Sequence, residues 1–198
     1  MLRGALLHLA NGDSTLFHDH IGDKLRYRYP LVQYRESGGY ASLFCLGDGV
    51  VAVEGLLCAA SSAEVRIGRR EEKLLVDSET RLNDELSLSD VFQEYTIRRY
   101  LPLNQENYAR YKTLDSIVDR YQMIEKCLIG NILSFAKSMG MFFEQQIKVK
   151  IQDVANTHEY TYKKVRMLGF DLKFKANVSL PRHIALGKGV SIGFGEIF

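Results

Sequence analysis

The strongest periodic pattern of apolar positions lies in the second half of the chain and predicts a long helix. Between residues 115 and 140, apolar side chains recur three and four positions apart, at Ile117, Tyr121, Ile124, Leu128, Ile132, Phe135 and Met139. This spacing places them on one face of a helix, and Gly140 stands where a glycine commonly ends one. Residues 115–140 therefore predict an amphipathic helix packed on a core.

Most other segments carry alternating or β-branched apolar runs, which predict strands. Strands are expected over residues 25–35, 40–46, 64–82 (a strand or hairpin), 91–103, 147–154 and 160–180, the last broken near Gly169, with a final strand at the C-terminus. Helices are expected over residues 2–10, from Asp48 to about residue 61, and in a short segment capped by Asn104. Residues 80–90 read as a polar connection and His158 as part of a turn.

The order of these elements predicts an α+β fold of two tandem ferredoxin-like βαββαβ units with antiparallel sheets. The N-terminal unit is expected over residues 1–84 and the C-terminal unit over residues 90–198. A complete first unit needs a strand before Leu2. We therefore expect the N-terminal unit either to lack its first strand or to build its sheet differently.

Composition sets the broad class of the protein. Hydrophobic residues make up 46% of the 198 positions, enough for a packed core. No apolar run is long enough to span a membrane, and the N-terminus lacks a signal-peptide pattern. The three cysteines, Cys45, Cys58 and Cys127, form no CxxC pair. Scattered thiols of this kind are typical of a reduced, cytoplasmic protein.

Charge is distributed unevenly along the chain. Residues 145–198 hold 9 Lys and Arg against 4 Asp and Glu, whereas residues 1–144 carry a small excess of acidic groups. A basic C-terminal half would suit a phosphate backbone. An ordinary solvated sheet face gives the same pattern, and charge alone favours that simpler interpretation.

Glycine is concentrated at the C-terminus, where Gly187, Gly189, Gly193 and Gly195 alternate with apolar residues. The segment is not a Walker A loop, because Lys188 is not followed by Ser or Thr. It is not a dinucleotide fingerprint either, since no helix follows the glycines. It predicts a glycine-rich turn that leads into a last apolar strand.

Two histidines two positions apart, His18 and His20, are the candidates for chemistry in the N-terminal half. On an extended segment they would face the same side. Histidine can accept or donate a proton near neutral pH. With Asp23 they could instead ligate a metal, although the adjacent Asp-His of a dinuclear hydrolase is missing. Two solvated surface histidines are the simplest alternative.

Both ends of the chain carry motifs of one known family. They are Leu2-Arg3-Gly4-Ala5, the Phe17-His18-Asp19-His20 turn, the Tyr27–Tyr34 strand with Tyr29-Pro30-Leu31, and the terminal Pro181 and Gly187–Gly195 pattern. The chain resembles the RAMP superfamily of CRISPR-associated RNA-binding proteins. Within it, the chain is similar to the repeat-RNA endoribonucleases, the sixth Cas protein of the b-type.

The resemblance implies metal-independent cleavage of CRISPR repeat RNA, with no cofactor. The ribose 2′-OH would attack the adjacent phosphorus, leaving a 2′,3′-cyclic phosphate and a 5′-hydroxyl. The implied catalytic residues are His20, His18 and Tyr29. The implied RNA-binding residues are Arg3, Arg28, Lys163, Lys164, Arg166, Lys173, Lys175, Arg182, Gly187, Lys188, Gly189, Gly193 and Gly195.

Other functions fit the same residues. A non-catalytic RAMP subunit would grip guide RNA within a complex of Cas proteins, and a ferredoxin-like domain could serve only to pair proteins. Expected partners are repeat RNA, as a single strand or hairpin, and other Cas proteins, with no membrane. A homodimer is a further expectation, because an unfinished N-terminal sheet leaves an edge to cover.

Overall fold

The computed structural model describes residues 3, 4, 6, 20, 21, 24, 25, 29–37, 39–60, 64–67, 69–73 and 75–198. The chain divides into two compact units, Met1–Arg81 and Leu82–Phe198. In the described part of the chain, no helix is both long and apolar enough to cross a membrane.

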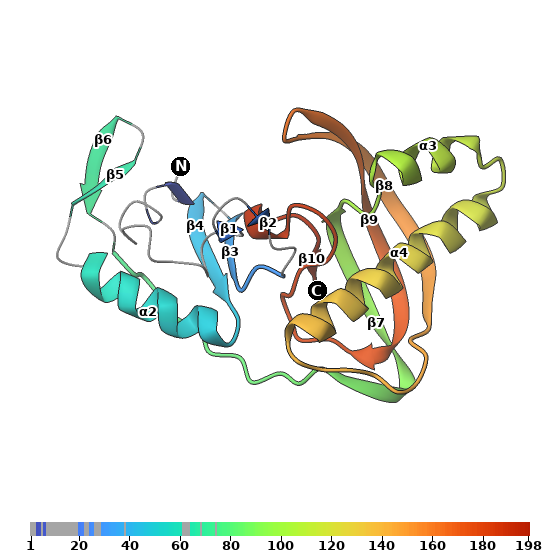
Figure 1. Cartoon of the computed structure of the whole chain (residues 1–198), viewed down its shortest axis with the longest axis horizontal. Coiled ribbons are helices and arrows are strands. Elements are labelled where there is room, and N and C mark those ends of the chain that lie inside the picture. Colours follow the sequence, from blue (N-terminus) through green and yellow to red (C-terminus); the bar gives the residue numbers. More distant parts are fainter. Residues whose placement is uncertain are drawn as a thin grey trace. The chain divides into compact units, whose positions relative to one another are not determined.

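The N-terminal unit is built on a hairpin followed by a helix (Figure 1). Its elements are β1 (His20–Ile21), β2 (Lys24–Leu25), β3 (Val32–Ser37), β4 (Tyr40–Cys45), α2 (Asp48–Ala60), β5 (Glu64–Ile67) and β6 (Arg70–Lys73). The core cluster of buried residues consists of Leu6, Val32, Tyr34, Val53 and Leu56. Burial of each large apolar side chain stabilises the fold by about 2 kcal/mol.

Several expectations for this unit can be checked. The predicted helix from Asp48 is α2, and the strand predicted over residues 40–46 is β4. The hairpin predicted over residues 64–82 ends at Lys73. Among the described residues, the ladders of this unit are the separate pairs β1–β2, β3–β4 and β5–β6. The described segments therefore contain no four-stranded N-terminal sheet.

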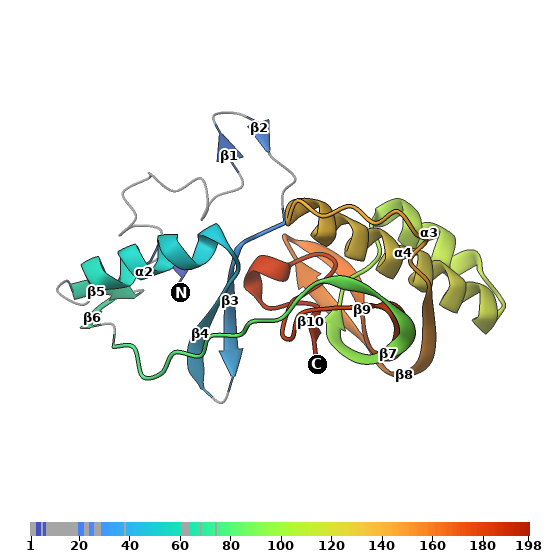
Figure 2. The same ribbon diagram turned by 90° about the horizontal axis from the view of Figure 1, so that it is seen from below.

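The C-terminal unit is a four-stranded antiparallel sheet covered on one face by two helices (Figures 1 and 2). Its elements are β7 (Ser87–Tyr100), α3 (Gln105–Thr113), α4 (Ile117–Ser138), β8 (Val149–Tyr162), β9 (Val165–Ser179), η1 (Val190–Ile192) and β10 (Glu196–Ile197). The strand order is β10-β7-β9-β8. The fourth strand thus lies beside the first, as in a ferredoxin-like unit. The short 3₁₀ turn η1 stands where that fold has its second helix.

The helix layer is fixed to the sheet by buried side chains and a few polar contacts. Ile124, Leu128, Ile132 and Phe135 of α4 are all buried, as are alternate residues of β9 from Phe170 to Val178. The Tyr100 hydroxyl donates to Oδ1 of Asn131 at 2.7 Å, and the Tyr111 ring meets Phe170 edge-on. The periodicity of residues 115–140 therefore predicted the central helix correctly.

Three local predictions in this unit are wrong. The break between the last long strands falls at Lys163 and Lys164, not at Gly169. Gly169 lies within β9 because the Tyr160 ring covers it: a Cβ at this position would stand 2.6 Å from Cε2 of Tyr160. His158 is in β8, paired with Gly169, and not in a turn. β7 begins at Ser87, inside the segment predicted as a polar connection.

Candidate nucleic-acid interface

The glycine-rich segment forms a tight loop, here called the glycine loop (residues 186–195). All four of its glycines have positive φ, between 73° and 92°. At Gly195 the constraint is absolute, because a Cβ there would overlap the carbonyl oxygen of Leu186. The same two residues are joined by a hydrogen bond of 2.8 Å from the Leu186 amide to the Gly195 carbonyl. The glycines are therefore required by the shape of the loop.

Hydrogen bonds fasten the glycine loop to the C-terminal end of β7. The Gly195 amide donates to the carbonyls of Arg98 and Arg99, at 3.1 and 3.2 Å. The Lys188 amide donates to the carbonyl of Leu101 at 3.1 Å. The loop is thus held in one conformation on the sheet, which is what a preorganised binding loop requires.

The fold itself uses some of the loop amides. The Gly193 amide donates to Val190 at 3.2 Å, and the Gly195 amide is taken by β7. In the described structure the amides of Gly187 and Ser191 have no acceptor, and both residues are half-exposed. These two amides are the ones available to a phosphate oxygen.

The predicted basic residues fall into two groups. Arg166, Lys175 and Arg182 are paired with Glu159, Glu94 and Asp84, at 3.8, 2.8 and 2.9 Å. In each pair a carboxylate lies beside the cation and offsets part of its charge toward a ligand. Lys163, Lys164, Lys173 and Lys188 form no ion pair with any residue that the structure describes. This second group has no carboxylate within ion-pair distance among the described residues, although Lys173 adds to the effect of Lys175 in lowering the pKa of Glu94.

Sequence reasoning missed two cations that lie beside the glycine loop, Arg98 and Arg99 of β7. The Arg98 guanidinium lies 4.8 Å from the Phe198 ring centroid, and that of Arg99 lies 5.6 Å from the Phe194 ring centroid. Both arginines are exposed, and neither forms an ion pair within the described segments. In the sequence, the feature that could have identified them is the pair of adjacent arginines near the end of the predicted strand over residues 91–103.

Arg182 and His183 make contacts within the C-terminal unit. The Arg182 amide and guanidinium donate to both carboxylate oxygens of Asp84, and these bonds lower the pKa of Asp84 to about 2. His183 has a left-handed φ of 62°, and its Nδ1 lies 3.1 Å from Oε1 of Glu196. Its ring packs edge-on against Phe198. These contacts brace the segment that precedes the glycine loop.

The structure describes some of the predicted catalytic and RNA-binding residues of the N-terminal unit. The backbone of His20 lies in β1, paired with Leu25. The His20 side chain, His18 and Arg28 lie outside the described part of the chain. Tyr29 is held in place by buried Gln33, whose Nε2 donates to the tyrosine hydroxyl at 3.0 Å. The Arg3 guanidinium lies 6.0 Å from the Tyr34 ring centroid.

A metal site at His18, His20 and Asp23 is likewise beyond what the described residues can test. Within those residues, no group of three or more His, Cys, Asp or Glu side chains is arranged to hold a metal ion.

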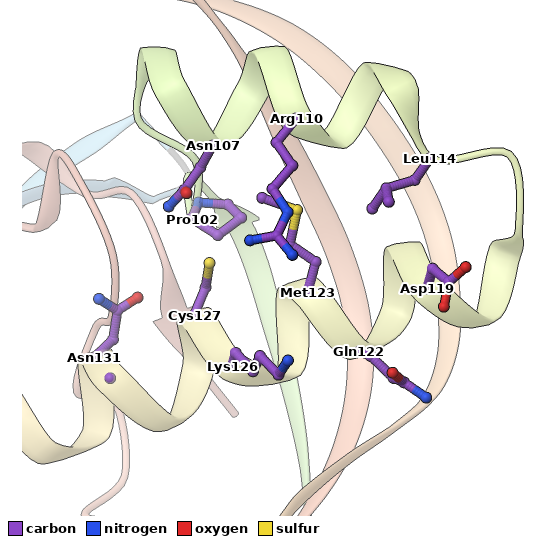
Figure 3. A pocket seen from close by; sticks show the side chains of 11 residues that line it. Pro102, Asn107, Arg110, Leu114, Asp119, Gln122, Met123, Lys126, Cys127 and Asn131 are labelled. Atoms are coloured by element: carbon purple, nitrogen blue, oxygen red, sulfur yellow. The ribbon is translucent and has the colours of Figure 1, made fainter.

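A separate cleft of about 450 Å³ lies between α3 and α4. Figure 3 shows Asn107, Arg110 and Cys127 between the two helices. Burial raises the pKa of the Cys127 thiol, so the thiol stays protonated near neutral pH. The cleft combines polar and apolar side chains and was not predicted from the sequence.

The fold defines an α+β protein of two units, the second of which is ferredoxin-like and ends in the glycine loop. The family model of the Cas6b N-terminal domain matches residues 1–84, and that of the Cas6b C-terminal domain matches residues 87–198. The chain therefore belongs to the Cas6b family, which confirms the resemblance seen at the two ends of the sequence.

The chain is also similar to individual proteins and solved structures. A crystal structure of Cas6b is 28% identical, with a TM-score of 0.83 over 99% of this chain and 88% of its own. A crystal structure of the CRISPR RNA processing endoribonuclease Cas6b is 24% identical, with a TM-score of 0.68 over 100% and 91%. The uncharacterized protein MJ0978 of Methanocaldococcus jannaschii is 33% identical over 101 residues, which are 51% of this chain and 67% of the relative.

Proposed function

We propose that this protein is an endoribonuclease that binds CRISPR repeat RNA and cuts it. One observation carries the proposal: Cas6b domain models match both units, end to end. A structure with the same fold is that of a CRISPR RNA processing endoribonuclease. The cations around the glycine loop that have no ion-pair partner in the described part of the chain are the groups that such a substrate needs.

The proposed reaction needs no metal. The ribose 2′-OH attacks the neighbouring phosphorus, the 5′-oxygen leaves, and the products are a 2′,3′-cyclic phosphate and a 5′-hydroxyl. One group must take the proton of the 2′-OH, another must protonate the leaving oxygen, and a donor must stabilise the phosphorane. We assign the proton transfers to His20 and His18, with Tyr29 as a donor to the phosphorane. Arg3 and Arg28 would contribute positive charge.

The C-terminal unit is proposed to hold the flanking RNA backbone. Lys188, Lys173, Arg98 and Arg99 supply positive charge, and the amides of Gly187 and Ser191 supply hydrogen bonds to phosphate oxygens. Lys163 and Lys164 extend this basic surface to the tip of the β8–β9 hairpin. Arg166, Lys175 and Arg182 contribute less, because each has a carboxylate partner.

The alternative is an RNA-binding RAMP subunit that does not cut. Cleavage by the isolated protein separates the two functions. Single-turnover cleavage of repeat RNA, with protein in excess, should slow by about 10²- to 10⁴-fold in His20→Ala, the range for loss of a general acid or base. His18→Ala should also slow the reaction. His183→Asn, which retains a residue that tolerates the left-handed backbone, should cleave at the wild-type rate. RNA binding without cleavage by the wild type would favour the subunit.

A further inference from the structure

The β8–β9 hairpin extends beyond the four-stranded sheet (Figure 1). Pairing between β7 and β9 ends at Tyr100 and Phe170, whereas β8 and β9 stay paired to the Tyr162–Val165 pair. The residues from His158 to Gly169 therefore form a two-stranded ribbon, on which no third strand lies among the residues that the structure describes. A projecting ribbon of this kind presents its side chains to solvent or to a ligand.

Aromatic side chains join this ribbon to the glycine loop. The Phe194 ring of the loop meets the Tyr160 ring edge-on, with centroids 5.2 Å apart, and meets the Tyr162 ring at 6.3 Å. All three residues are half-exposed. We call Tyr160, Tyr162 and Phe194 the aromatic ridge.

Two cations lie against the ridge. The Arg99 guanidinium stands 5.6 Å from the Phe194 centroid, and Lys163 Nζ stands 5.6 Å from the Tyr162 centroid. Both side chains are exposed and, in the part of the chain that the structure describes, neither has a carboxylate partner. Arg99 is held there by a bulge: its φ is 51°, and its amide donates to Oδ1 of Asp171 at 2.7 Å.

Half-exposed aromatic rings with uncompensated cations beside them are the surface that unpaired nucleotides require. Bases that are not stacked in a duplex stack on aromatic rings or on guanidinium planes, while the cations meet the phosphates. We propose that the aromatic ridge binds one or two unpaired nucleotides of RNA, with a base stacked on Tyr162 or Phe194 and phosphates at Lys163 and Arg99. The proposal rests on the proposed function and assigns the single-stranded part of the substrate to this ridge.

The test uses a short uridine RNA that carries one 2-aminopurine, whose fluorescence falls when it stacks on a ring. A second RNA of equal length is abasic at several positions and so keeps the phosphates without the bases. Tyr162→Ala should weaken binding of the first RNA about 5- to 100-fold, the range for loss of one stacked base, and abolish the quenching. It should leave the affinity for the abasic RNA unchanged.

Matched variants separate stacking from charge and from misfolding. Tyr162→Phe keeps the ring and should bind like the wild type. Thr161→Ala, at the exposed neighbouring position, should also be neutral. Lys164→Gln removes a charge and should weaken both RNAs equally. Equal binding of both RNAs by wild type and Tyr162→Ala, or an equal loss for both RNAs, would overturn the proposal. Such results would leave the ridge as packing or as a surface for a protein partner.

Failure of the ridge and failure of the nuclease proposal can be told apart. The proposal that the aromatic ridge binds nucleotides is supported if the quenching depends on Tyr162, even when the protein does not cut repeat RNA. Only this proposal is contradicted if the protein cuts repeat RNA while Tyr162→Ala binds both test RNAs like the wild type.

Discussion

The carbonyl oxygen of Leu186 occupies the space that a Cβ on residue 195 would need. Gly195 also has a φ of 74°, and its amide donates to the carbonyl oxygens of Arg98 and Arg99. It therefore connects the glycine loop to β7. The close approach of these two backbones is therefore one of the contacts that fix the conformation of the loop.

A side chain at position 195 should therefore disrupt the C-terminal unit. Gly195→Ala combines a left-handed backbone with a backbone overlap, and we expect it to lower the free energy of unfolding by about 3 kcal/mol or more. Denaturant unfolding measures the loss. RNA affinity should fall as well, because Lys188 is carried by the same loop.

Gly130 provides the matched control for this substitution. It lies in α4, and a Cβ there would meet no atom within 4 Å. Gly130→Ala should raise the free energy of unfolding by about 0.5–1 kcal/mol, the helix preference for alanine over glycine. If Gly195→Ala and Gly130→Ala both have the wild-type free energy of unfolding, the backbone at Leu186 can move to make room for a Cβ at position 195.

The turn of the β8–β9 hairpin is expected to be less stable, but more positively charged, than the usual Asn-Gly turn. Lys163 and Lys164 have φ values of 48° and 65°, a conformation that hairpins usually fill with Asn-Gly. Lys163→Asn with Lys164→Gly should raise the free energy of unfolding by about 1 kcal/mol. The double variant should bind RNA more weakly. A variant that is more stable and binds RNA equally well would show that the turn lysines have no role in binding.

The Asp84–Arg182 pair gives a pH dependence with a defined sign. The folded-state pKa of Asp84 is about 2, below the ordinary value of about 3.9, because the guanidinium and the amide of Arg182 donate hydrogen bonds to its carboxylate. The pair's contribution to stability is therefore complete above about pH 5 and is lost as the pH falls from about 4 toward 2. The difference in unfolding free energy between wild type and Asp84→Asn should shrink over that range.

Asp90→Asn is the control for the loss of a carboxylate charge, since Asp90 is exposed and has no ion-pair partner in the described structure. It should change the free energy of unfolding at pH 7 very little. The assignment would be contradicted if the difference in unfolding free energy between wild type and Asp84→Asn grew as the pH falls.

RNA affinity should fall steeply with salt if the unpaired cations contact phosphates. Removing one such contact, as in Lys188→Gln, should reduce the slope of log affinity against log salt by about 0.7–0.9. Lys137→Gln changes the charge equally at the C-terminal end of α4 and should leave the slope unchanged. Equal effects of the two substitutions would mean that only net charge matters.

The sequence predicted those parts of the fold in which a local pattern is sufficient. The period of α4 and the density of glycine in the terminal loop each follow from neighbouring residues. The chain break between β8 and β9 was misplaced because glycine commonly interrupts strands, whereas Gly169 is there to accommodate the Tyr160 ring. Two lysines in a left-handed turn give no comparable signal.

The candidate interface was harder to predict than the fold. Which cations stay available depends on partners distant in sequence: Arg182 meets Asp84, 98 positions earlier, and Lys175 meets Glu94. Charge counts cannot reveal such pairs. Arg98 and Arg99 were missed because their importance comes from the loop that packs on β7, a contact that only the fold creates.

The most direct test of the proposed function is to incubate the purified protein with repeat RNA in excess chelator and to identify the chemical groups at the product ends. We predict one main cut that proceeds in chelator and leaves a 2′,3′-cyclic phosphate and a 5′-hydroxyl. Products with a 3′-hydroxyl and a 5′-phosphate, or cleavage that stops in chelator, would contradict a metal-independent nuclease.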